Sequence, residues 1–236
     1  MTKDLAKVEQ YAIMQKGKMD MVKEMLNENV GDTSITFGDL KRISFPSGKS
    51  KTWQIPDIEA EDGVIESKAI NGIILLTQKT RQYWEASFEE TGGGTPPDCS
   101  SEDGRTGRGL PGGECADCAY SQFDDNTGRQ ACKESRLIFM ITQDEILPIL
   151  VSAPPTSLAA IRKYLLGLTS KQQYAHSVYT ELTLETDKSK AGGISYPKLV
   201  ARKLGNVELP DVSAEYAKMF KPYLKREVSR VVTDDV

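Results

Sequence analysis

The 236-residue chain contains a single histidine, His176. One histidine and no cysteine–histidine pairing leave nucleophilic catalysis without an obvious general base. The sequence also lacks the phosphate-binding pattern G-x-x-x-x-G-K-[ST], the zinc-protease pattern H-E-x-x-H, the deaminase pattern H-x-E and the hydrolase pattern G-x-S-x-G. These absences indicate a binding protein rather than an enzyme.

No apolar run approaches the roughly 20 residues that a membrane-spanning helix needs. The first ten residues, MTKDLAKVEQ, are too polar for a signal peptide. We therefore expect a cytoplasmic protein whose thiols stay reduced. The formal net charge of −4 argues against binding polyanions by overall attraction, although it permits a local basic groove.

Cysteine is absent from most of the chain, and all four cysteines lie between positions 99 and 132. Their spacing is C-x15-C-x2-C-x13-C. The central C-x2-C lets two sulfurs reach one ion, and the flanking loops bring the other two. We predict a structural Zn²⁺ site with Cys99, Cys115, Cys118 and Cys132 as ligands.

The segment around these cysteines supports a metal. Residues 91–114 are rich in glycine and charge and have almost nothing with which to form a core. Such a segment stays disordered unless something offsets its ordering entropy, and metal binding does so. A redox pair of Cys115 and Cys118 and an iron–sulfur cluster remain as alternatives. A catalytic zinc is disfavoured because it needs an open position and usually histidine or carboxylate ligands.

Hydrophobic periodicity divides the rest of the chain into strands and helices. Apolar residues recur at helical spacing over 4–28, over 158–168 after Ser157, and over 212–230 with an interruption near Pro222. Strand patterns cover a hairpin within 35–56, a long segment over 63–86 with a bulge or bend at Gly72, two short strands over 135–153 and another over 174–186. Residues 194–206 suggest a short helix.

This order predicts three parts of the chain. They are an N-terminal helix in 1–34, an OB-like β domain in 35–190 with a zinc-binding insertion at 91–133, and a C-terminal helical segment in 191–236. The predicted class is α+β, mainly β: a small, OB-like antiparallel β-barrel of about five strands with flanking helices. Alternating β and α segments are missing, which disfavours a parallel doubly wound sheet. A sheet covered by helices on one face is the alternative.

Basic and aromatic residues occur together in the first hairpin, at the end of the long strand and in the insertion. Aromatic rings stack bases at about 1–3 kcal/mol each, while Lys and Arg neutralise phosphates. The alternative interpretation of this pattern is a tryptophan in the core with solvent-exposed cations beside it. The candidate nucleic-acid contacts are Lys41, Arg42, Lys49, Lys51, Trp53, Lys79, Arg81, Tyr83, Arg105, Tyr120, Phe123 and Arg129.

Three phrases resemble a group of proteins encoded by bacteriophages and integrative elements. They are W-x-I-P at Trp53–Pro56, the four cysteines with their flanks, and P-P-T-S-L at Pro154–Leu158. The resemblance covers roughly residues 37–186. It implies a phage or mobile-element protein in a bacterial host cell, but not an activity.

A looser resemblance, of architecture alone, is to phage single-stranded DNA-binding proteins that carry a zinc module in an OB-fold. Those proteins use a mixture of Cys and His at the metal, whereas this chain offers four cysteines. The first hypothesis is therefore a single-stranded DNA-binding protein of replication or recombination, able to form homo-oligomers. The alternative is a zinc-stapled protein-interaction module of a replication, recombination or defence assembly, without nucleic-acid contact.

Overall fold

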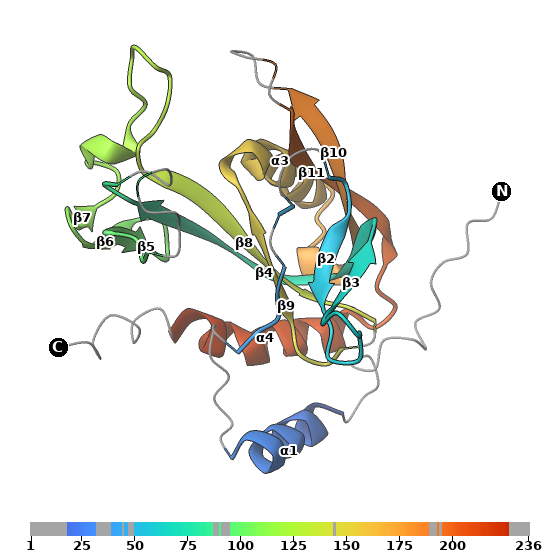
Figure 1. Cartoon of the computed structure of the whole chain (residues 1–236). Coiled ribbons are helices and arrows are strands. Elements are labelled where there is room, and N and C mark those ends of the chain that lie inside the picture. The colour runs from blue at the N-terminus through green and yellow to red at the C-terminus, as the bar shows by residue number, and fades with distance from the viewer. Residues whose placement is uncertain are drawn as a thin grey trace. The chain divides into compact units, whose positions relative to one another are not determined.

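The computed structural model of the protein describes residues 18–31, 39–43, 45–46, 50–86, 90, 95–143, 145–188, 193 and 195–226 (Figure 1). Over these ranges the chain is mixed α+β and mainly sheet, which confirms the predicted class at that level. The described strands form no closed barrel, so the OB-like barrel is not confirmed. No described helix combines the length and the apolar character needed to cross a membrane.

The chain divides into two compact units. Unit 1 comprises Met1–Thr77, Ile138–Ser152 and Ala159–Val236, and unit 2 comprises Gln78–Leu137 and Ala153–Leu158. The predicted boundaries at 34 and 190 do not coincide with this division. The predicted insertion at 91–133, in contrast, falls within unit 2.

Unit 1 contains most of the main sheet, and two of its strands, β4 and β8, continue into unit 2. Along the sheet β1 is followed by β9, β8 and β4, and then by β10 and β11. β1 and β9 are parallel, whereas β10 is antiparallel to both β4 and β11. The strands are β1 (Arg42–Ile43), β4 (Ala69–Tyr83), β8 (Lys133–Ile141), β9 (Ile149–Ala153), β10 (Val178–Lys188) and β11 (Ser195–Asn206).

Three helices and two short 3-10 turns accompany this sheet. The helix predicted over 158–168 is confirmed, and the tyrosine Tyr164 on it shares a 2.6 Å hydrogen bond with Thr180 of β10. Of the helix predicted over 4–28, residues 4–17 lie outside the described ranges. The elements are α1 (Lys18–Val30), η4 (Pro155–Ser157), α3 (Leu158–Thr169), η5 (Ala175–Ser177) and α4 (Pro210–Arg226).

Two local predictions were wrong. The predicted hairpin within 35–56 does not form, because β1 pairs with β9 while β2 (Trp53–Pro56) pairs with β3 (Val64–Ser67). Residues 195–206 form strand β11 rather than a helix, because they pair along their whole length with β10. The lysines and alanine of this segment permit a helix locally, so the tertiary pairing decides.

Gly72 marks a close approach of backbones rather than a bulge. A Cβ at this position would lie 2.3 Å from the carbonyl oxygen of Ile141. Gly72 itself pairs in register with Thr180 of β10. The absence of a side chain therefore lets three strands of unit 1 come together.

Trp53 belongs to the core of unit 1, with none of its surface exposed. Its indole Nε1 donates a 3.2 Å hydrogen bond to the carbonyl oxygen of Leu182, and its ring meets the ring of Phe45 edge-on at 5.1 Å. This burial contradicts the predicted stacking of a base on Trp53, because a fully enclosed ring has no face left to offer. The alternative interpretation, a tryptophan in the core, is therefore correct for Trp53.

Unit 2 contains the C-terminal part of β4 and the N-terminal part of β8. Beyond β4 the chain forms three short strands, paired antiparallel in succession from β4 to β5, β6 and β7. These elements are β5 (Cys99–Ser101), β6 (Thr106–Gly109), β7 (Gly113–Glu114) and η3 (Ala119–Ser121).

Replacing Trp53 with alanine should lower the free energy of unfolding by about 3–5 kcal/mol, because it empties a large buried site. Trp84 is the matched control, since it is partly exposed in unit 2. Trp84→Ala should cost far less in the same urea titration. Equal stability of Trp53→Ala and the unaltered protein would contradict the core assignment.

Candidate metal centre

All four cysteines line one small cavity in unit 2. Cys99, Cys115 and Cys132 are buried, and Cys118 is partly exposed. They form no disulfide. The cavity measures about 10 Å³, roughly the space of one water-sized sphere.

The cysteines also stand in place of a conventional core. Among the described residues of unit 2, the buried apolar side chains are Cys99, Cys115, Cys132, Leu137 and Ala153. Leu137 and Ala153 lie where the chain joins unit 1. The body of unit 2 is therefore centred on sulfur rather than on hydrocarbon.

Backbone pairing brings the cysteines to this cavity. Cys99 pairs with Tyr83 on β4 and with Gly109 on β6. The amide of Cys115 donates to the carbonyl oxygen of Arg105 at 2.6 Å, and the amide of Cys132 donates to that of Tyr120 at 2.8 Å. Each buried cysteine is thus held by a hydrogen bond of its own backbone.

Ser121 closes the loop that carries the C-x2-C pair. Its hydroxyl donates to the carbonyl oxygen of Cys118 at 2.9 Å and also to that of Cys115. Its amide donates to the carbonyl oxygen of Cys118 at 3.0 Å. Sequence reasoning missed this residue, because a serine three positions after a cysteine carries no distinctive signal.

Two glycines are required by close approach. A Cβ at Gly107 would lie 3.0 Å from the sulfur of Cys99. Gly109 has a φ of +100°, and a Cβ there would lie 2.1 Å from the carbonyl oxygen of Asp98. Side chains at either position would push β6 away from the strand that carries Cys99.

Asp103 caps the turn between β5 and β6. Its carboxylate accepts hydrogen bonds from the amides of Arg105 and Thr106 at 2.7 and 3.0 Å and from the hydroxyl of Ser101 at 3.1 Å. The bond from Thr106 is the main reason that the pKa of Asp103 is lowered. The dipeptide Asp103-Gly104 is a turn signal in the sequence, but the sequence alone does not place this turn beside the cysteines.

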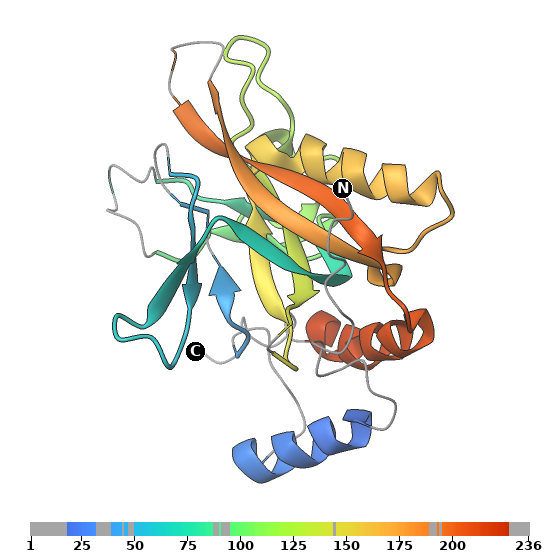
Figure 2. The same cartoon turned by 90° about the vertical axis from the view of Figure 1, so that its right-hand side faces the viewer.

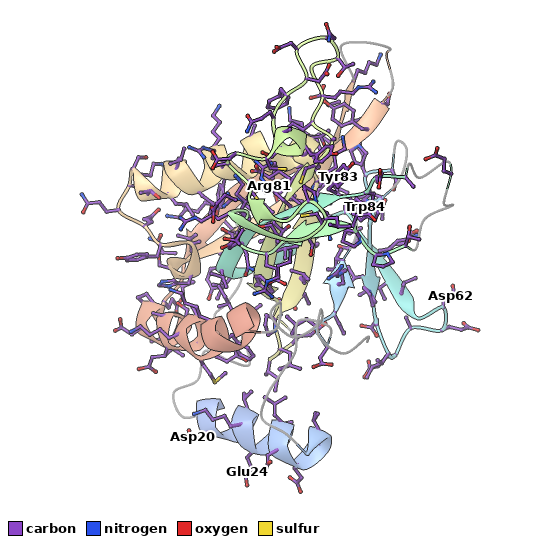
Figure 3. The ribbon with its side chains drawn as sticks, turned by 90° about the vertical axis from the view of Figure 1, so that its left-hand side faces the viewer. Asp20, Glu24, Asp62, Arg81, Tyr83 and Trp84 are labelled. Carbon is purple, nitrogen blue, oxygen red and sulfur yellow. The ribbon has the colours of Figure 1, made fainter. Side chains whose placement is uncertain are left out.

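A partly buried ion-pair network adjoins the cavity. The side chain of Arg81 is 12% exposed, and its Nη2 lies 2.8 Å from Oε2 of Glu134. The same oxygen lies 2.9 Å from Nζ of Lys79. Figure 3 shows Arg81 and Tyr83 close together near the end of β4. Lys79 and Arg81 thus both pair with Glu134, and their role as phosphate contacts stays a prediction.

Arg81 also lines the cavity of the four cysteines. Its Nε and Nη1 are buried, and neither has a hydrogen-bond partner among the described residues. The thiol of Cys132 is near enough for its pKa to respond: burial raises it, and the charge of Arg81 opposes that rise. Two unused donors beside four sulfurs suit thiolates, which accept hydrogen bonds better than thiols do.

The four cysteine sulfurs are donors of the kind that zinc prefers, but their arrangement is not that of a formed metal site. Within the described ranges, no three His, Cys, Asp or Glu side chains are arranged as a group ready to hold an ion. The structure therefore neither establishes nor contradicts the predicted zinc.

An aromatic pair lies beside the cysteines. The rings of Tyr83 and Tyr120 stack with centroids 4.3 Å apart. Desolvation, with a contribution from Tyr120, raises the pKa of Tyr83 to about 12, so its phenol stays neutral at physiological pH. Tyr120 is partly exposed, and Phe123 is 68% exposed. Arg105 and Arg129 are exposed in the same unit.

The remaining predicted contacts lie in unit 1. Lys41 is paired with Glu145 at 2.8 Å. Arg42 and Lys51 are exposed. Lys49 lies outside the described residues.

Unit 2 has a negative net charge. Its sequence holds seven Lys and Arg residues against eleven Asp and Glu residues. A shallow depression of about 360 Å³ next to Cys118 is lined by Glu114, Asp117 and Tyr120, among others. Long-range attraction of a polyanion to this unit is therefore weak.

No protein-family model, curated protein or solved structure matches this chain significantly. The resemblances noted from the sequence stay predictions, and the site must be interpreted from its own chemistry.

Replacing Glu134 with glutamine should destabilise unit 2 by about 1–3 kcal/mol, because it leaves the buried guanidinium of Arg81 without its counter-charge. Glu114→Gln is the matched control, since Glu114 is exposed in the same unit. Limited proteolysis within residues 95–132 should accelerate for Glu134→Gln and not for the control. Equal cleavage rates for both variants would show that the network does not hold the unit together.

Proposed function

We propose that the chain binds single-stranded DNA with a metal-stapled insertion of an OB-like sheet, in the replication or recombination of a bacteriophage or mobile element. The support for the sheet is its strand order. β4 is followed along the sheet by β8 and β9 on one side and by β10 and β11 on the other, with α3 between β9 and β10 in the chain. We take this order as support for an OB-like sheet, although the described strands form no closed barrel.

The place of the insertion in that order carries the proposal. Unit 2 emerges between β4 and β8, which correspond to the first and second strands of the OB order. In OB-folds the loop between these strands contributes to oligonucleotide binding. The context of phages and mobile elements rests on the sequence resemblance alone.

A Zn²⁺ ion held by Cys99, Cys115, Cys118 and Cys132 is proposed as the staple. Three observations support it: the shared cavity, the lack of another core in unit 2, and the unused donors of Arg81. The cavity of about 10 Å³ favours one ion over an iron–sulfur cluster. Four thiolates on a divalent ion leave two excess negative charges, which the guanidinium of Arg81 partly offsets.

The proposed contacts are the exposed members of the predicted set in unit 2. Tyr120, backed by Tyr83, and Phe123 stack bases, while Arg105 and Arg129 contact phosphates. The acid excess of unit 2 means that attraction to phosphates contributes little. We therefore expect affinity to depend mainly on stacking.

A protein-interaction module is the second candidate function. It is favoured by the depression beside Cys118, because Glu114 and Asp117 in its lining suit a basic side chain of a partner protein. The exposed side chains of Leu110 and Phe123 would add apolar contact. The metal staple is the same in both candidates.

The purified protein should contain one zinc ion per chain by elemental analysis. Cys118→Ser should lose most of this zinc and expose residues 95–132 to proteolysis, since binding energy is folding energy at such a site. Ser100→Ala, a neighbouring change on β5, should retain the metal. Iron with a visible absorption spectrum, or a metal-free protein with the same proteolysis pattern, would overturn the zinc staple.

Fluorescence titration with oligo-dT at low salt should show saturable quenching. With two arginines of unit 2 at phosphates, the slope of log K against log [salt] should be shallow, about −1.4. Phe123→Ala should weaken binding by about 1–3 kcal/mol. Leu110→Ala is the control, because it removes an equally exposed apolar side chain that cannot stack a base.

Two outcomes would contradict this proposal. One is no quenching and no mobility shift at low salt, and the other is equal loss of affinity in Phe123→Ala and Leu110→Ala. A stable protein complex captured by the intact protein under the first outcome, and weakened by Asp117→Lys, would instead support the interaction module.

A further inference from the structure

A long stretch of the sequence that includes α3 is free of acidic residues. From Ile146 to Thr180 the sequence contains no Asp or Glu, although the chain has 34 such residues in 236. This stretch carries Arg162, Lys163 and Lys171. The stretch includes the helix α3 and the turn η5.

Two of the three cations of this stretch lie on one exposed face of α3, and the third follows the end of the helix. Arg162 and Lys163 lie on the same side of the helix as Leu166, about one turn further on, and Lys171 follows. Leu166 is 55% exposed, and Tyr174 beyond the helix is 71% exposed. None of the three cations forms a salt bridge with a described residue. We call Arg162, Lys163, Leu166, Lys171 and Tyr174 the basic face.

A second surface of unit 1 has the complementary character. Residues 55–67, which form most of the β2–β3 hairpin, contain five acidic residues and no Lys or Arg. Exposed apolar side chains lie among them, and Ile58 is 95% exposed. We call this segment the acidic hairpin. Its acidic residues are Asp57, Glu59, Glu61, Asp62 and Glu66.

The tip of the acidic hairpin is a formed turn. The carboxylate of Asp57 accepts a 2.8 Å hydrogen bond from the amide of Glu59, and the amide of Asp57 donates to the carbonyl oxygen of Gly63 at 3.0 Å. Val64 and Ile65 on β3 are exposed as well. The hairpin thus presents charge and apolar surface on one ordered element.

These two surfaces lie on different sides of unit 1. Figure 2 shows the β2–β3 hairpin on the left and α3 on the right, with strands of the main sheet between them. Figure 3 likewise places Asp62 far from α3. The two surfaces of one copy therefore do not meet.

We propose that the acidic hairpin of one copy binds the basic face of α3 in the next copy. Carboxylates would lie against Arg162, Lys163 and Lys171, and Ile58 and Ile65 would contact Leu166 and Tyr174. Because the two surfaces differ, the contact is heterologous, and it leaves a free hairpin at one end and a free basic face at the other. Copies can therefore add in a row.

Charge and apolar surface have different parts in this contact. Opposite charges steer the two surfaces together and set their orientation, while exclusion of water from the apolar side chains supplies most of the stability. Exposed ion pairs are screened as salt rises, so the association should weaken at high ionic strength. The inference does not depend on the metal or on DNA, but a row of copies would suit a protein that coats a single strand.

Sedimentation velocity of the full chain at low salt tests the proposal. The weight-average mass should rise above 26.1 kDa with protein concentration and fall back in 0.5 M NaCl. A basic-face variant, Arg162→Glu with Lys163→Glu, should stay monomeric. A hairpin variant, Glu59→Lys with Glu61→Lys, should also stay monomeric. Lys188→Glu, an exposed cation on β10, should associate as the unaltered protein does.

A mixture of the two monomeric variants tests the proposed contact most directly. Each keeps one intact surface, and their two reversed surfaces again carry opposite charges, so an equimolar mixture should associate into rows in which the two variants alternate. A single chain carrying all four substitutions should associate again with the charges exchanged. A monomeric unaltered protein at all concentrations, or association that both variants retain, would overturn the proposal, as would a mixture that stays monomeric.

Discussion

Ordering a glycine-rich segment without a hydrocarbon core is the constraint on which unit 2 depends. Fixing the backbone of each residue costs about 1–2 kcal/mol, and a short stretch with few apolar side chains buries too little surface to offset that cost. Here Cys99, Cys115 and Cys132 occupy the positions that leucines would take in a larger core. The hydrogen bonds of Ser121 and Asp103 then shape loops that the sulfur centre holds together.

The charges around the sulfur centre follow from the same constraint. Arg81 is largely buried, so it needs Glu134 on one side, and its remaining donors face the cysteine cavity. Glu134 is shared with Lys79, which ties the two strands β4 and β8 together at the base of unit 2. This arrangement pairs both cations with Glu134, whereas Phe123 of the same unit is strongly exposed. That is why the proposed binding of single-stranded DNA relies on rings more than on charge.

Sequence reasoning succeeded where a pattern has a direct physical meaning. The periodicity of 158–168 and the apolar runs at 135–153 predicted α3, β8 and β9, and the cysteine spacing predicted one common cavity. It failed where long-range pairing decides, as for β11, or where burial cannot be judged from neighbours. Trp53 has flanking lysines and looked exposed, but the carbonyl oxygen that satisfies its indole is on Leu182, 129 positions away. The ion pairs of Lys41 and Arg81 likewise join residues far apart in the chain.

The central claim is that a metal orders unit 2 while unit 1 is stable without it. Amide hydrogen exchange of the full chain, with and without a strong zinc chelator, tests it most directly. The account predicts that the amides of Cys115 and Cys132 lose protection on chelation, while amides paired between β10 and β11 keep theirs. Unchanged protection of the two cysteine amides, in a sample shown to be metal-free, would contradict it.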